Sequence, residues 1–149
     1  MRAVIQKVKN ANVVVENSEI GAINHGLLVL LAVKDTDTED DIAYIKKKIE
    51  KLRIFEDSEG KMNLSVADVG GSILLVSQFT LYGDVRKGNR PSFIESAKPD
   101  KANEFYETLK KDLISDGFNV QTGQFQAHME VSLLNDGPVT IIIDSERIL

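Results

Sequence analysis

The side chains of this 149-residue chain that could do chemistry gather in two short stretches. The first, residues 77–83 (SQFTLYG), follows the apolar run 73–76 and brings three hydroxyls and an amide to the end of an expected strand. Backbone N–H groups at the end of a strand that leaves its ladder can bind a developing oxyanion. The stretch therefore indicates a place that holds an anionic, hydrogen-bonding ligand. Taken alone, it fits an ordinary polar edge strand slightly better.

The second stretch is residues 135–138, Asn-Asp-Gly-Pro. Asn-Asp-Gly is strong turn chemistry, and it predicts a hairpin tip between two strands. Proline is the one residue type at which a cis peptide bond costs little, and such bonds cluster in tight turns. By itself this stretch predicts only a hairpin.

Other common chemistries find no support in the sequence. There is no cysteine, which excludes disulfides, thiolate catalysis and cysteine-ligated zinc. The only histidines, His25 and His128, have no recognisable catalytic context, so a Ser-His-Asp triad is not expected. Neither the phosphate-binding GxxxxGK[ST] pattern nor GxGxxG occurs, and no acidic or histidine cluster has metal-ligand spacing. We expect neither a metal nor a cofactor.

The elements that must position these stretches follow from apolar periodicity. A capping box with Thr36 as N-cap and Glu39 at the third position predicts a helix over residues 37–52. Pro99 begins a second helix that ends at Gly117. Residues 62–65 are expected to be irregular. Strands are expected at 2–8, 12–16, 20–23, 27–33, 72–79, 118–121, 127–133 and 139–143.

This pattern predicts an α+β fold in a single domain, residues 1–149. We expect mixed or antiparallel sheets, barrel- or sandwich-like, with the two helices packed on one face. The N-terminus is too polar for a signal peptide, and the longest apolar run, residues 27–33, is too short to span a membrane. We therefore expect a cytosolic protein. The net charge of −5 does not suggest a polyanion partner, but basic residues cluster at 46–53 and 86–90.

Three segments in register resemble the D-aminoacyl-tRNA deacylases: residues 77–83, 87–93 and 135–140. Residues 1–6, 52–57 and 60–63 also look like that family. The resemblance implies an enzyme without a cofactor that hydrolyses the ester between a D-amino acid, or glycine, and the 3′ end of tRNA. It also implies a homodimer with the active site at the subunit interface.

The resemblance carries functional roles to particular residues. Residues 77–80 line the family's site, and Thr80 takes the place of the assigned nucleophile. Gly137-Pro138 matches the cis-proline motif, which one subunit inserts into its partner's pocket to crowd the Cα substituent of an L-amino acid. The residues implied are Ser77, Gln78, Phe79 and Thr80 for catalysis; Gly137, Pro138, Asn135, Met129, Phe125 and Lys7 for the substrate and its chirality; and Arg86, Lys87 and Arg90 for tRNA.

Two positions depart from the family's pattern. Lys7 stands where many relatives have arginine, which we take to steady the Gly-Pro loop, and lysine lacks the planar fork of arginine. Gln126 stands where relatives often have glycine, near the expected pocket wall, and its side chain could narrow the pocket.

Two mechanisms remain open at this stage. In the first, water attacks the ester, its oxyanion is bound by the Phe79 and Thr80 N–H groups with the Gln78 side chain, and the 2′-hydroxyl of the terminal adenosine assists. In the second, which we favour less, Thr80 is a covalent nucleophile, and this needs a base that the sequence does not supply. Competing functions are a non-catalytic tRNA-binding module and a small-molecule esterase or amidase. The resemblance also implies a fold that serves as an editing domain appended to archaeal threonyl-tRNA synthetases.

Overall fold

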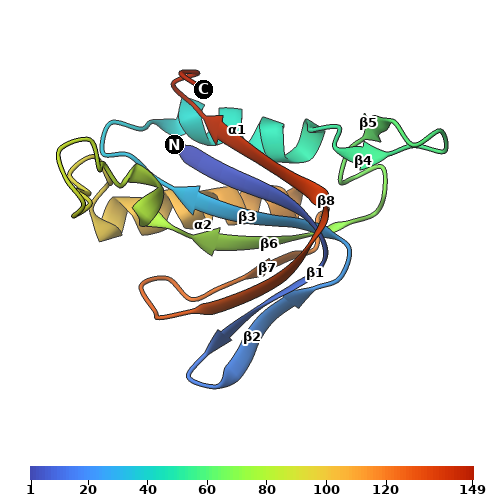
Figure 1. The fold of residues 1–149 in the computed structure, drawn as a ribbon, viewed down its shortest axis with the longest axis horizontal. Helices are drawn as coiled ribbons and strands as arrows, with labels where there is room; N and C mark the ends of the chain where they lie inside the picture. The colour runs from blue at the N-terminus through green and yellow to red at the C-terminus, as the bar shows by residue number, and fades with distance from the viewer.

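The computed structural model describes residues 1–149 and has the predicted α+β architecture (Figure 1). One six-stranded sheet contains most of the strands, and a short two-stranded sheet stands apart from it. The elements are β1 (Arg2–Val15), β2 (Ser18–Ile23), β3 (Gly26–Ala32), α1 (Glu39–Lys51), β4 (Phe55–Glu56), β5 (Met62–Leu64), β6 (Ser72–Ser77), the 3₁₀ helix η1 (Phe79–Tyr82), α2 (Pro99–Ser115), β7 (Val120–Thr122) and β8 (Glu130–Asp144).

The long strand β1 organises the large sheet. The strand order is β2-β1-β3-β6-β7, and β8 pairs with β1 as well. β1 pairs with β3 through its first half, with β2 through its second half, and with β8 along nearly its whole length, always antiparallel. β3, β6 and β7 run parallel to one another. The prediction of two separate strands at 2–8 and 12–16 is wrong, because register shifts against β8 absorb the polar link without ending the ladder.

The sheet curls until its two ends meet. β2 lies against β7, where a Cβ atom added to Gly21 would be only 2.4 Å from the carbonyl oxygen of Thr122. Only glycine permits backbones to approach this closely. The nearly closed, barrel-like sheet confirms the expected architecture (Figure 1).

The curled sheet separates two apolar cores. The larger core lies between one face of the sheet and both helices, so the prediction that the helices pack on one face is confirmed (Figure 1). The smaller core fills the inside of the curl. Successive β3 residues alternate between the two: Leu27 and Val29 belong to the helix side and Leu28 to the inside. This explains why residues 27–33 are apolar without interruption.

Helix α1 begins two residues later than predicted. Its N-cap is Thr38, whose N–H donates to Oδ2 of Asp41 at 2.8 Å. Thr36 is not the N-cap. It lies in a turn before the helix, in which Asp37 accepts the N–H of Lys34 at 2.6 Å. The prediction for α2 is confirmed from its start at Pro99 to the positive-φ glycine that follows it. Neither helix is long and apolar enough to cross a membrane.

Two loop predictions are wrong. Residues 62–64 form β5, which pairs with β4, instead of an irregular connection. Residues 135–138 are not a hairpin tip, because the chain continues in the same direction as one strand, β8, on both sides of them. The turn-forming residues are accommodated as a bulge within the ladder.

Candidate active site

A cavity of about 660 Å³ opens where the parallel strands β3 and β6 end. The carboxyl ends of parallel strands are a common place for ligands, because the chain leaves the sheet there and frees backbone groups. The wall is completed by α2 and by the segment before β8, and most of its lining is apolar. Six residues implied by the sequence line it: Ser77, Gln78, Phe79, Phe125, Gln126 and Met129.

The catalytic stretch leaves the sheet earlier than predicted. β6 ends at Ser77, and the Gln78 N–H donates to the Leu31 carbonyl oxygen at 2.7 Å. The chain then turns into η1 instead of staying extended to residue 79, so the expected alternation of side chains does not hold. The first hydrogen bond of this turn runs from the Leu81 N–H to the Gln78 carbonyl at 3.2 Å. The two N–H groups before it, on Phe79 and Thr80, have no intrahelical acceptor.

The Thr80 side chain lies beside these groups without a base. Thr80 is exposed and is not part of the cavity lining. Its hydroxyl accepts a hydrogen bond from the Gln78 side-chain amide, which cannot take up a proton at neutral pH. This contact argues against Thr80 as a nucleophile. It also places the Gln78 amide, an additional donor, next to the two N–H groups.

Aromatic residues form much of the cavity wall. The rings of Phe79 and Phe93 meet edge-to-face at 5.1 Å, and those of Tyr106 and Phe125 lie 6.2 Å apart. Burial raises the pKa of Tyr106, whose hydroxyl donates to the Leu75 carbonyl at 2.8 Å. Tyr106 is therefore a neutral structural donor. Sequence reasoning placed Tyr106 only in the apolar stripe of a helix. It did not predict that Phe93 would line the cavity.

The Gly137-Pro138 motif lies in the bulge of β8. Thr140 pairs with Gln6 and Asn135 with Val8, so residues 136–139 all stand opposite a single position of β1. The bond between Gly137 and Pro138 is cis.

Local contacts close the base of this bulge. The Asn135 side chain accepts the Val139 N–H at 2.9 Å and donates to the Thr140 hydroxyl at 3.1 Å. Gly137 has φ +144°, and a Cβ atom there would be 2.6 Å from Cγ2 of Val139. The backbone path is therefore available to glycine and strained for other residues.

Lys7 lies opposite the bulge and is almost fully buried, with a side chain 1% exposed. Its ammonium donates to both carboxylate oxygens of Glu56 at 3.0 Å and lies 3.9 Å from Oδ2 of Asp136. The hydrogen bond from Lys7 lowers the pKa of Glu56. Lys7 thus links β4 to the residue before Gly137. Sequence reasoning missed Glu56, which no motif singled out beyond the segment 52–57.

Within one chain, the two groups of implied residues stay apart. Lys7, Asn135, Gly137 and Pro138 do not line the cavity. No three His, Cys, Asp or Glu side chains are placed to hold a metal ion.

The basic loop after η1 is only partly available to an RNA. Arg86 donates from Nε and Nη2 to the two carboxylate oxygens of Asp84 at 2.9 and 2.8 Å. This pairing lowers the pKa of Asp84 to about 2. Lys87 and Arg90 are exposed and form no ion pair.

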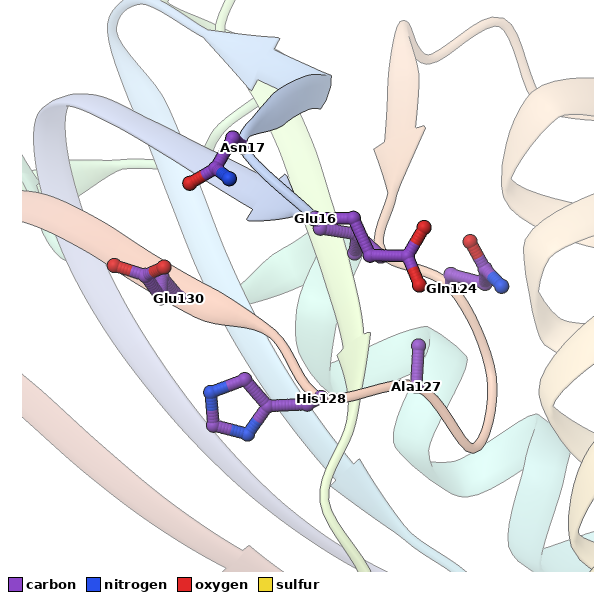
Figure 2. A pocket seen from close by; sticks show the side chains of 7 residues that line it. Glu16, Asn17, Gln124, Ala127, His128 and Glu130 are labelled. Atoms are coloured by element: carbon purple, nitrogen blue, oxygen red, sulfur yellow. The ribbon is translucent and has the colours of Figure 1, made fainter.

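A smaller hollow of about 410 Å³ lies between the β1–β2 turn and the segment before β8 (Figure 2). It shares Ala127 and His128 with the larger cavity, and Glu16 and Glu130 line it as well. Two carboxylates make this hollow a poor place for an RNA backbone. The larger cavity is therefore the candidate active site. His128, which sequence reasoning treated as an ordinary exposed histidine, contributes to both.

Comparison with known proteins decides the family. The family profile described as D-Tyr-tRNA(Tyr) deacylase matches residues 4–144. The chain belongs to the D-aminoacyl-tRNA deacylase family. It is 59% identical over 146 residues to a D-aminoacyl-tRNA deacylase of Chloroherpeton thalassium, covering 97% of this chain and 96% of the relative. It is 58% identical over 147 residues to one from Thermus aquaticus, covering 99% and 97%.

Solved structures share the fold of this chain. A structure titled "c-Myc DNA Unwinding Element Binding Protein" superposes with a TM-score of 0.92 at 40% identity, covering 97% of this chain and 98% of the other. A second, titled as a probable eukaryotic D-amino acid tRNA deacylase, has a TM-score of 0.80 at 18% identity, covers 95% and 97%, and shows the fold alone. The resemblance predicted from the sequence is confirmed: this deacylase is a hydrolase that acts on ester bonds.

Proposed function

We propose that this deacylase releases D-amino acids, and glycine, from the 3′ end of tRNA and so keeps D-amino acids out of translation. The observation that carries the proposal is the cavity at the ends of β3 and β6, which Phe79 lines. Phe79 begins η1, in which the N–H groups of Phe79 and Thr80 have no intrahelical acceptor. An aminoacyl ester is already activated, so binding its carbonyl next to such donors supplies much of the catalysis. The tRNA substrate places this activity in the cytoplasm.

The chemical step uses water as the nucleophile. The ester carbonyl oxygen accepts hydrogen bonds from the Phe79 and Thr80 N–H groups, with the Gln78 amide beside them. Water attacks the carbonyl carbon and loses a proton, the negative charge on the oxyanion is stabilised, and the 3′-oxygen leaves with a proton. The 2′-hydroxyl of the terminal adenosine transfers the proton from the attacking water to the 3′-oxygen, since the Thr80 hydroxyl has only an amide partner.

Selection against L-amino acids comes from a second copy of the chain. In this proposal the Gly137-Pro138 bulge enters the partner's cavity, and its backbone crowds an L substituent at Cα. The separation of bulge and cavity within one chain supports this arrangement. So does β8, an edge strand that exposes Leu134 and Ile142, 52% and 57% accessible. An edge strand with exposed apolar side chains favours pairing with another chain. Glycine has no substituent to clash, so glycyl-tRNA is cleaved.

The tRNA backbone is bound chiefly by Lys87 and Arg90 in the loop after η1. Their charges have no acidic partner within the chain, whereas Arg86 is already paired with Asp84. Phosphate contacts of this kind hold any tRNA, so the acceptor end and its amino acid define the substrate.

The test of the function is deacylation of matched substrates. Purified protein is incubated with D-tyrosyl-tRNA, L-tyrosyl-tRNA and the methyl ester of D-tyrosine. We expect rapid release from D-tyrosyl-tRNA only. Binding of the tRNA without release would show a non-catalytic module, and release from the methyl ester alone would show a small-molecule esterase.

Replacing Thr80 by valine tests the mechanism. Valine keeps the backbone N–H and the side-chain shape but removes the hydroxyl. We expect the rate of D-tyrosyl-tRNA deacylation to fall by about tenfold or less, since only one auxiliary hydrogen bond is lost. Loss of essentially all turnover in a folded Thr80→Val protein would establish Thr80 as the nucleophile.

A further inference from the structure

We propose that Arg2, far from the cavity in sequence, is a positioning residue that fixes η1 for ester hydrolysis. This inference rests on the proposed function of the Phe79 and Thr80 N–H groups. It concerns a residue that touches no substrate and acts through the backbone of the 3₁₀ turn.

The Arg2 side chain makes three contacts around the end of η1. Its Nη1 donates to the Leu81 carbonyl oxygen at 3.0 Å, and its Nε donates to Oδ2 of Asp144 at 2.8 Å. Its guanidinium carbon lies 4.5 Å from the centre of the Tyr82 ring. One side chain therefore holds two consecutive residues of η1 and ties them to the end of β8.

The anchors of this contact are themselves rigid. Arg2 pairs with Ala32 of β3 and with Asp144 of β8, so its backbone is held between two strands. The Asp144 side chain is fully buried, and its Oδ1 accepts the Glu146 N–H at 2.8 Å. Tyr82 is 2% exposed. A guanidinium held between such groups has little freedom to move.

The other end of η1 is fixed by the sheet. The Gln78 N–H donates to the Leu31 carbonyl at 2.7 Å, as a last contact with β3. Phe79 and Thr80 lie between this contact and the Arg2 clamp. Because the turn is only four residues long, holding both ends sets where its two N–H groups stand. A small displacement of catalytic donors costs a large part of the rate.

Arginine is needed here for its shape as well as its charge. Its planar fork donates in two directions while its face stacks on an aromatic ring. A lysine at this position can keep the ion pair with Asp144, but it lacks the planar group that bonds Leu81 while stacking on the Tyr82 ring. Arg2→Lys therefore removes the clamp on η1 and spares the buried carboxylate from losing its partner.

The experiment measures steady-state deacylation of D-tyrosyl-tRNA by Arg2→Lys and by a matched control, Arg147→Lys. Arg147 also stacks on a tyrosine, 5.2 Å from the Tyr44 ring centre, but does not touch η1. We expect kcat of Arg2→Lys to fall at least tenfold with KM within twofold of wild type, and preference for D over L to be unchanged. Amide hydrogen exchange over residues 79–83 should quicken in Arg2→Lys only.

Wild-type kcat in a folded Arg2→Lys protein would overturn the inference. So would a loss of kcat that merely matches the unfolded fraction measured by circular dichroism, because Arg2 would then be structural only. If Arg2→Lys does not fold, the double variant Arg2→Met/Asp144→Asn removes the buried charge together with the clamp and takes the same measurements. Absence of deacylation in the wild type would instead refute the proposed function, and hydrogen exchange would still test the clamp.

Discussion

At the scale of single residues, Lys7 is the buried charge that faces the Gly137-Pro138 bulge. Its buried ammonium is neutralised by Glu56 and faces Asp136, one residue before the glycine. The resemblance implied that Lys7 steadies this loop, and the contact supports that role, although the partner Glu56 was not foreseen. Lysine has a point charge where arginine has a planar guanidinium. Here Glu56 binds that charge and keeps Lys7 in place.

The Lys7–Glu56 pair predicts a pH dependence of stability. The folded pKa of Glu56 is lowered, so its contribution is complete above the unfolded glutamate value of about 4.3 and is lost as pH falls through the folded pKa. We expect the melting temperature of wild type to exceed that of Glu56→Gln by a constant margin from pH 7 to about 5. The margin should shrink below that. A margin that persists unchanged at low pH would show that the carboxylate charge is not involved.

Gln126, which lines the cavity, has an unfavourable backbone conformation. Its φ is +61°, a left-handed conformation that costs a non-glycine residue about 1 kcal/mol. Replacing it with glycine removes this cost while adding about 0.5–1 kcal/mol of unfolded-chain entropy. We expect Gln126→Gly to leave the free energy of unfolding nearly unchanged, and Gln124→Gly, at an ordinary φ two residues earlier, to lower it by about 0.5–1 kcal/mol. Urea denaturation measures both, and equal losses would contradict the account.

At the scale of elements, the bulge of β8 should be sensitive to one added methyl group. A Cβ atom on Gly137 would meet Val139 at 2.6 Å, and φ +144° disfavours alanine independently of space. We expect Gly137→Ala to displace the backbone that crowds L substituents and to lower the preference for D- over L-tyrosyl-tRNA at least tenfold. The ratio of the two deacylation rates measures this. An unchanged ratio in a folded variant would remove the bulge from chiral selection.

The sequence predicted elements whose apolar pattern is set by packing and missed those set by register. Residues 27–33 and both helices were predicted because each must bury a face or stripe against the core. Residues 135–138 carry strong local turn chemistry, yet pairing with β1 on both sides keeps them inside one strand. The preference of these residues for a turn is overridden by about ten paired positions between β8 and β1, which no pattern in a single sequence reveals.

The candidate site divides in the same way. The apolar run 73–76 correctly predicted a strand that ends beside the cavity, although β6 ends at Ser77 and Phe79 begins η1 instead of continuing the strand. The turn into η1 could not be predicted, since its contacts join residues far apart in the sequence: the Arg2 side chain bonds the Leu81 carbonyl and lies over the Tyr82 ring. Cavity walls such as Phe93 come from loops whose position only the fold determines.

At the scale of the whole molecule, the cavity and the Gly137-Pro138 bulge, which we propose form one site, do not meet within one chain. The cavity lies at the ends of β3 and β6, and the bulge lies in β8, whose outer edge carries exposed apolar side chains. A second copy, related by a two-fold axis, would cover that edge and bring each bulge to the other copy's cavity. We propose that chirality is selected across this interface.

Subunit mixing tests that claim most directly. The first partner is Gly137→Ala, which we expect to cleave L-tyrosyl-tRNA. The second is Ala102→Trp: Ala102 lines the cavity, so we expect the indole to fill it and abolish activity. The measurement is L-tyrosyl-tRNA deacylation by a fixed amount of the first while the folded second is added in excess and subunits exchange. We predict that L cleavage falls while D cleavage persists, because the intact bulge of the inactive copy restores rejection in the active cavity. L cleavage that is unaffected by the second protein would contradict selection across the interface.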